Sequence, residues 1–130
     1  ERFALKTGLK LIAMHQRTRF ELKTKFNYVN SLGPSEFLSV IKNAKYVITT
    51  SFHATAFSII FQKQFVSLKI GKGNRLSSLL NLLSLEKQLV SEDYYEDFSI
   101  LKDQIDFSNS MELLNKERDV SLNYLIDALK

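Results

Sequence analysis

Residues 46–68 alternate between strand-like and helix-like sequence, and this alternation restricts the chain to few folds. Tyr46–Thr49 and Phe65–Leu68 are short runs rich in β-branched and aromatic residues, which is typical of buried strands. Between them, Phe52–Phe61 is an apolar segment long enough for a helix. A strand, a helix and a second strand in this order predict a βαβ unit, in which the two strands run parallel.

The same alternation continues on both sides of this unit. Three further segments have strand character: Leu9–Met14, which we expect to be short and buried, Phe26–Val29, and Leu89–Val90. Four segments carry helix signals: Arg2–Thr7, the residues after Gly33-Pro34, the residues after the loop 71–75, and a C-terminal segment. We therefore predict one Rossmann-like α/β domain over residues 1–130, with a parallel sheet and helices on both of its faces.

The C-terminal helix has a predicted start and a predicted apolar face. Asn109 and Glu112 have the spacing of a capping box, so the helix is expected to begin at Asn109. Its apolar face, opposite a charged one, comprises Leu113, Leu114, Val120, Tyr124, Leu125 and Ala128.

Charge is distributed unevenly along the chain. Residues 1–85 carry 13 basic and 3 acidic side chains, whereas residues 86–130 carry 5 basic and 11 acidic ones. No acidic residue lies between Glu36 and Glu86. An electric field of this sign favours an anionic ligand such as a phosphate, a carboxylate, a nucleotide or a nucleic acid. The simpler alternative is that these lysines and arginines only solvate the surface.

The composition also excludes several kinds of site. The chain has no cysteine, which rules out disulfides, thiolate metal ligands and a cysteine nucleophile. Without a cluster of His or Cys, no metal site is expected. No apolar run reaches the roughly 18 residues of a membrane span, and no signal peptide is recognisable. We expect a cytoplasmic protein, which can also lie peripherally at the inner face of the membrane.

One of the two histidines, His53, lies where the strand at Tyr46–Thr49 passes into a helix. Ligands of parallel sheets bind beyond the carboxyl ends of the strands, where helix N-termini offer unpaired N–H groups. An imidazole there can donate or accept a proton at physiological pH, although a partly buried histidine bonded to a carbonyl is the alternative. Ser51 either caps the helix or offers its hydroxyl to a ligand. His15, after the first strand, is the weaker candidate.

Two loops are expected at the same edge of the sheet as His53. One begins at Gly33-Pro34, and the other is "GKGNR" (71–75), whose side chains suit phosphate or carboxylate. The second loop matches neither the P-loop nor the dinucleotide fingerprint. The predicted anion site therefore consists of the two loops and the helix start: Gly33, Pro34, Ser51, Phe52, Ala54, Lys72, Asn74 and Arg75.

A longer stretch around His53 resembles a known family. Residues 33–65, "GPSEFLSVIKNAKYVITTSFHATAFSIIFQKQF", are similar to the C-terminal half of polysaccharide pyruvyl transferases. That family reads roughly G-P-x-E-F-L, then a strand V-I-T-x, then S-F-H-G-T-A-F-S and K-P-F. Residues 74–90 and 118–129 are similar to its later segments. This sequence departs from the pattern at Ala54, where the family has glycine, and at Gln64, where it has proline.

The resemblance implies a GT-B-like enzyme of two Rossmann-like domains, of which this chain is mainly the C-terminal one. An N-terminal domain of the same protein would complete the enzyme, so the fragment alone is expected to be inactive. Family members transfer a pyruvyl ketal from phosphoenolpyruvate to a sugar of a surface polysaccharide precursor. By this resemblance His53 is the general acid or a contact of phosphoenolpyruvate, which is the donor substrate, and no cofactor is needed.

Two other functions remain open at this point. One is a GT-B-like glycosyltransferase, in which the loop 71–75 grips the nucleotide of a nucleotide-sugar donor. The other is a non-catalytic module that binds a polyanion, although no nucleic-acid motif is present and nucleic acid is not the expected partner. The expected partners are an anionic donor and a sugar or lipid-linked saccharide. The sequence leaves homo-oligomers open.

Overall fold

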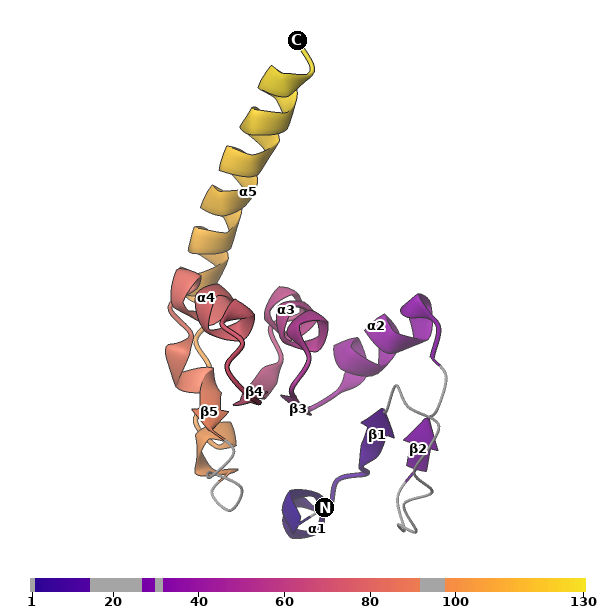
Figure 1. Cartoon of the computed structure of the whole chain (residues 1–130). Coiled ribbons are helices and arrows are strands. Elements are labelled where there is room, and N and C mark those ends of the chain that lie inside the picture. The colour runs from indigo at the N-terminus through magenta and orange to yellow at the C-terminus, as the bar shows by residue number, and fades with distance from the viewer. Residues whose placement is uncertain (1, 15–26, 30–31, 92–97) are drawn as a thin grey trace. The chain divides into compact units, whose positions relative to one another are not determined.

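The computed structural model describes residues 2–14, 27–29, 32–91 and 98–130. The chain divides into two compact units, Glu1–Val40 and Ile41–Lys130. Figure 1 labels their helices and strands. Whether the whole chain is a single domain stays a prediction.

The first unit contains a short helix and a two-stranded parallel sheet. Helix α1 (Arg2–Thr7) ends at Gly8, whose φ of 66° is the left-handed conformation that glycine adopts most readily. Strand β1 (Ile12–Met14) pairs with β2 (Asn27–Val29). Both strands were predicted, but the prediction that the first is buried is wrong: Ile12 is 42% and Met14 38% exposed. A ladder of only two short strands gives these side chains few neighbours within their unit.

Helix α2 (Pro34–Asn43) begins at the proline that the sequence indicates as its start. Proline is favoured at a first helical position because its fixed φ suits the helix and its missing N–H is not needed there. The N–H of Phe37 donates to the carbonyl of Gly33 at 3.0 Å, so the helical hydrogen bonds begin at this glycine. Ile41, in the last turn, is fully buried.

The second unit is built on a three-stranded parallel sheet, which confirms the predicted α/β fold of Rossmann-like type. Its strands are β3 (Tyr46–Thr49), β4 (Gln64–Lys69) and β5 (Leu89–Ser91), in the spatial order β3-β4-β5. The register pairs Val47 with Phe65 and Leu68 with Val90. Since β4 lies between two parallel neighbours, it is the strand that needs apolar residues on both faces.

Helices connect these parallel strands, as the βαβ pattern requires. Helix α3 (Phe52–Ile60) joins β3 to β4, and α4 (Arg75–Leu82) with the 3₁₀ helix η1 (Glu86–Gln88) joins β4 to β5. Helices α3 and α4 contact each other, and both lie on the same face of the sheet (Figure 1). The 3₁₀ helix η3 (Phe98–Leu101) also contacts β4.

The core of this unit forms where α3 packs on the central strand β4 and α4 packs on α3 and β5. Phe65 and Val66 in β4 are inaccessible to solvent, as are Ile59 in α3 and Leu80 in α4. Adjacent residues of a strand point to opposite faces, so the burial of both Phe65 and Val66 shows that β4 is covered on both sides. Because β4 is buried on both faces, its position is fixed, and with it the carboxyl end of the sheet at this strand.

The C-terminal helix α5 (Ser108–Ala128) does not begin with the predicted capping box. Asn109 lies inside the helix, and the residue at the N-cap position, Phe107, makes no side-chain cap. The carboxylate of Asp106 instead accepts a hydrogen bond from the N–H of Ser108 at 2.9 Å. A carboxylate at this end is favoured by the unpaired N–H groups and the helix dipole, so it replaces the predicted cap.

The hydrogen bonds at Asp106 predict how acid affects this unit. The backbone N–H and the hydroxyl of Ser108 hold the pKa of the Asp106 carboxyl below its ordinary value. A carboxyl whose pKa is lower in the folded state stabilises the fold at pH values above its unfolded-state pKa of about 3.9. This stabilisation is lost as the pH falls through the folded-state pKa. We expect Asp106→Asn to lower the urea midpoint at pH 7 and to flatten the loss of stability between about pH 4 and pH 2. Asp103→Asn removes the same charge from an exposed neighbour and should leave both unchanged, and equal effects would contradict this role.

The second half of α5 leaves its apolar residues exposed. The helix extends beyond the sheet of its unit (Figure 1). Its exposed large apolar residues are Val120, Leu122, Tyr124, Leu125 and Ile126, and the exposed Leu129 follows directly at the C-cap. Within the described residues of this unit, no element covers this second half of the helix, whereas Leu113 and Leu114 of the predicted apolar face are partly buried.

Candidate active site

The turn between β3 and α3 is held by hydrogen bonds to all three polar groups of Ser51. Its N–H donates to Oγ1 of Thr49 at 3.0 Å, and its Oγ accepts from the N–H of Ala54 at a longer 3.4 Å. Its carbonyl accepts from the N–H of Thr55 at 3.0 Å. Ser51 therefore caps the helix, which was one of the two roles predicted for it.

A buried pair of hydroxyls fixes this helix start to the central strand. Oγ1 of Thr55 donates to the carbonyl of Ser51 at 3.0 Å and lies 2.7 Å from Oγ of Ser67 in β4. A threonine hydroxyl has one proton, so Ser67 must be the donor in the second bond. Thr55 and Ser67 are both fully buried. This chain of hydroxyls orients the first turn of α3 relative to β4.

His53 is the second residue of α3 and is exposed at the carboxyl end of β3. Its imidazole meets the ring of Phe52 edge-on, with 5.9 Å between the ring centroids and an interplanar angle of 88°. An exposed imidazole on the first turn of a helix can meet a ligand and exchange a proton with it. The position is the predicted one, and the catalytic role stays a prediction.

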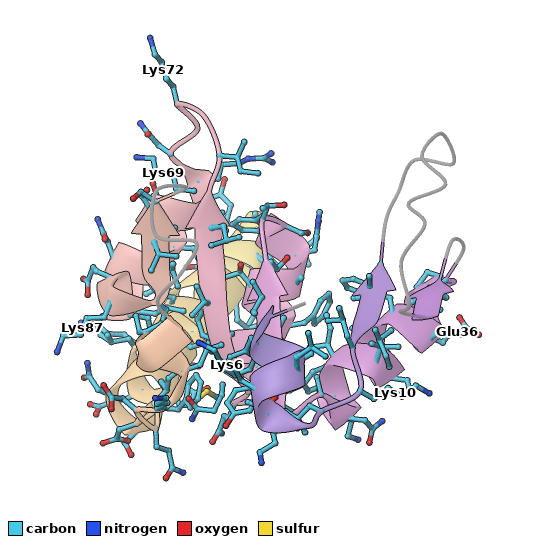
Figure 2. The ribbon with its side chains drawn as sticks, turned by 90° about the horizontal axis from the view of Figure 1, so that it is seen from below. Lys6, Lys10, Glu36, Lys69, Lys72 and Lys87 are labelled. Atoms are coloured by element: carbon cyan, nitrogen blue, oxygen red, sulfur yellow. The ribbon has the colours of Figure 1, made fainter. Side chains whose placement is uncertain are left out.

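The loop between β4 and α4 leaves the same carboxyl edge of the sheet. Gly71 has a φ of 68°, a conformation that other residues rarely adopt. Lys72 extends away from the body of the protein (Figure 2). Asn74 occupies the N-cap position of α4 without a side-chain cap, and the guanidinium of Arg75 lies over the ring of Phe52, 5.9 Å from its centroid. Of the predicted basic residues, the structure brings Arg75 to the start of α3.

The remaining predicted site residues are placed differently. Ala54 is only 3% exposed, and its N–H is engaged by Ser51, so its side chain packs inside the unit. Gly33 and Pro34 begin α2 in the first unit, and their place in a shared site with His53 stays a prediction. His15 lies outside the described residues.

Three hydroxyl residues that shape this turn were not predicted from the sequence: Thr49, Thr55 and Ser67. Threonine in a strand and small polar residues near a helix start are too common to be singled out without knowing which of them meet in space. Lys69, the exposed last residue of β4, from which the loop departs, was not predicted either (Figure 2). The sequence signal that could have indicated Lys69 is its position immediately before the predicted loop.

The described part of the chain offers no group of three His, Cys, Asp or Glu side chains that could hold a metal ion. No helix in that part has both the length and the apolarity to cross a membrane. The described residues place an imidazole, lysine and arginine cations, hydroxyls and backbone N–H groups at the carboxyl edge.

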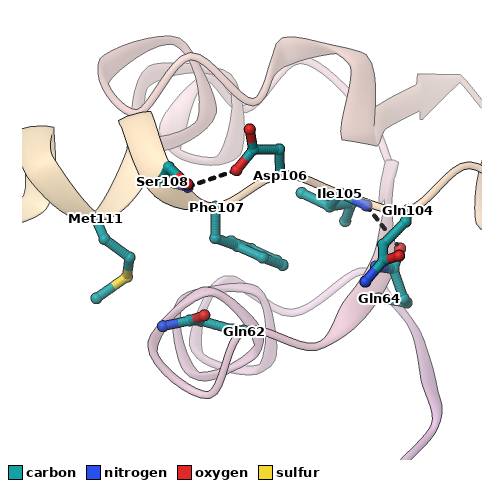
Figure 3. A pocket seen from close by; sticks show the side chains of 8 residues that line it. All are labelled: Gln62, Gln64, Gln104, Ile105, Asp106, Phe107, Ser108 and Met111. Carbon is teal, nitrogen blue, oxygen red and sulfur yellow. Dashed lines mark hydrogen bonds between the residues drawn. The ribbon is translucent and has the colours of Figure 1, made fainter.

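A cavity lies at the opposite edge of the sheet. It has a volume of about 680 Å³ and is lined by Gln62 and Gln64, by Gln104, and by residues 105–108 and 111. Gln64 is the first residue of β4, and its Oε1 accepts from the N–H of Ile105 at 3.2 Å (Figure 3). This is the amino end of the strand, whereas ligands of parallel sheets bind at the carboxyl ends. The topology of the sheet therefore favours the His53 edge as the active site.

The fold and this edge define a class of protein: a parallel α/β domain with an exposed histidine and basic groups where such domains bind anionic ligands. The family model of polysaccharide pyruvyl transferase matches residues 3–71, just over half of the chain. The chain belongs to the polysaccharide pyruvyl transferase family and is thus a member of a transferase family. The matched region includes Ser51–Ala54 and ends before Lys72. No curated protein and no solved structure matches the chain.

Proposed function

We propose that this chain is part of an enzyme that transfers a pyruvyl ketal from phosphoenolpyruvate to a sugar of a surface polysaccharide precursor. The observation that carries the proposal is His53, exposed at the carboxyl end of β3 inside the region that matches the family. The basic side chains Lys69, Lys72 and Arg75 at the same edge suit a donor that carries a phosphate and a carboxylate.

In this proposal His53 acts as the general acid. Its imidazolium protonates the methylene carbon of phosphoenolpyruvate and leaves an oxocarbenium-like centre at the neighbouring carbon. One sugar hydroxyl attacks that centre, and its proton passes to the imidazole. A second hydroxyl of the sugar then replaces the phosphate, and the proton of this hydroxyl leaves with the phosphate as inorganic phosphate. The reaction balances without a cofactor, because the oxygens of both new C–O bonds belong to the sugar and the broken C–O bond releases the phosphate.

Ala54 is compatible with this chemistry although the family pattern has glycine there. Because Ala54 is buried, its methyl group does not stand in the solvent-facing space in front of His53. The extra methyl is accommodated by packing inside the unit, so a ligand can approach the helix start as it would beside a glycine. We place the reaction in the cytoplasm, at the inner face of the membrane when the acceptor is lipid-linked.

The test is a donor assay with the full-length protein. We expect phosphoenolpyruvate to raise the melting temperature and, with a nucleotide-linked or lipid-linked sugar, to yield a pyruvyl ketal and inorganic phosphate in equal amounts. Mass spectrometry of the sugar and a phosphate assay measure the two products. A response to sugar nucleotides together with none to phosphoenolpyruvate would contradict the proposal and favour a glycosyltransferase.

A further inference from the structure

Phe52 is the common contact of two side chains of the candidate active site. The guanidinium carbon Cζ of Arg75 lies 5.9 Å from the centroid of the Phe52 ring, and the His53 ring meets the same ring edge-on. Phe52 is itself half-buried at the start of α3, so its ring is supported by the helix. One aromatic ring thus links the loop between β4 and α4 to the turn that carries His53.

Arg75 is held by this ring without a neutralising carboxylate. No acidic residue lies between Glu36 and Glu86, and among the described residues no Asp or Glu forms an ion pair with Arg75. A guanidinium that rests on an aromatic face keeps its N–H groups available, because the ring is not a strong hydrogen-bond acceptor. Its planar N–H groups suit the oxygens of a phosphate or carboxylate.

Lys72 belongs to the same loop but lacks this support. Its side chain extends away from the body of the unit (Figure 2), and an exposed lysine has several rotatable bonds to immobilise on binding. The two cations of the loop therefore differ in their preorganisation, although they carry equal charge.

We propose that Phe52 is a positioning residue that holds the guanidinium of Arg75 in place for the phosphate of the donor, and that Arg75, not Lys72, is the main phosphate-binding cation of this loop. The inference rests on the proposed function for the identity of the donor. It changes the role expected for Phe52 from a direct ligand contact to an indirect one. It also assigns phosphate binding mainly to Arg75 and gives Lys72 a peripheral role.

The test compares matched variants of the full-length protein in two measurements, the KM for phosphoenolpyruvate and the Kd for inorganic phosphate. Arg75→Gln should raise both by about tenfold or more, the loss expected for a hydrogen bond to a charged group. Lys72→Gln, with the same change in charge, should raise both by clearly less than Arg75→Gln does. Lys87→Gln, at an exposed residue of η1 outside the candidate site, should leave both near wild type. Phe52→Leu should raise both by about twofold to fivefold with little change in kcat, whereas Phe52→Tyr, which keeps the aromatic face, should restore them.

The double variant Phe52→Leu with Arg75→Gln gives the decisive result. If Phe52 acts through Arg75, the double variant binds phosphate no more weakly than Arg75→Gln alone. Additive losses, equal losses for Lys72→Gln and Arg75→Gln, or a wild-type protein that binds no phosphate would each overturn the inference. Should Phe52→Leu fold poorly, Phe52→Met provides a second non-aromatic variant for the same cycle.

The outcomes for this inference and for the proposed function are separate. A protein that binds phosphate with the expected coupling of Phe52 and Arg75 but forms no ketal contradicts the proposed function and supports the inference. A protein that forms the ketal but shows additive losses of phosphate binding for Phe52→Leu and Arg75→Gln supports the proposed function and contradicts the inference.

Discussion

Replacing His53 by glutamine is expected to lower the kcat of ketal formation by about 100-fold or more in the full-length protein. A positioned general acid contributes typically 10²–10⁴-fold to a rate, and glutamine cannot protonate a carbon at neutral pH. His53 is exposed, so the substitution removes little buried surface and the fold should be retained. The measurement is steady-state kinetics with phosphoenolpyruvate, accompanied by the melting temperature of each variant.

The matched control for this prediction is the other histidine of the chain. His15→Gln makes the same chemical change and should leave kcat near the wild-type value. Near-wild-type turnover of a folded His53→Gln protein would refute the catalytic assignment. A large loss in His15→Gln alone would move the assignment to that residue.

The second large effect is expected in the core, where Phe65→Ala should lower the free energy of unfolding by about 3–5 kcal/mol. Phe65 is 0% exposed and lies in β4, the central strand of the sheet. Truncating its side chain therefore leaves a cavity in the core, which surrounding side chains fill only in part. Domains of this size are stable by only about 5–15 kcal/mol. The variant should therefore be partly unfolded or unfold at far lower urea concentration, as far-UV circular dichroism in a urea titration would show.

Leu82→Ala is the control for Phe65→Ala. Leu82 lies in α4 and is 50% exposed, so its truncation removes little buried apolar surface. We expect a loss below about 1 kcal/mol for this change. Similar losses for the two variants would show that β4 is not the buried centre of the unit.

The sequence alone was sufficient for the order of elements in the second unit. The run Tyr46–Thr49 was predicted with its observed bounds, because β-branched residues next to a helix-forming apolar segment leave few alternatives. The helix after it was predicted one residue longer than observed. The predicted start of α5 was wrong because Asp106 and a capping box at Asn109 are alternative caps for the same helix end. Residue spacing alone does not show which of the two caps forms.

The sequence by itself determined that a histidine follows a strand in a parallel α/β fold, and that few acids lie near it. These properties depend on local pattern and composition, which need no knowledge of distant contacts. Only the tertiary structure decided that Thr55 meets Ser67 across 12 residues and that Arg75 rests on Phe52, 23 residues away. Such pairs form when α3 packs on β4 and α4 packs on α3, and many other polar or aromatic pairings would have been equally compatible with the sequence pattern.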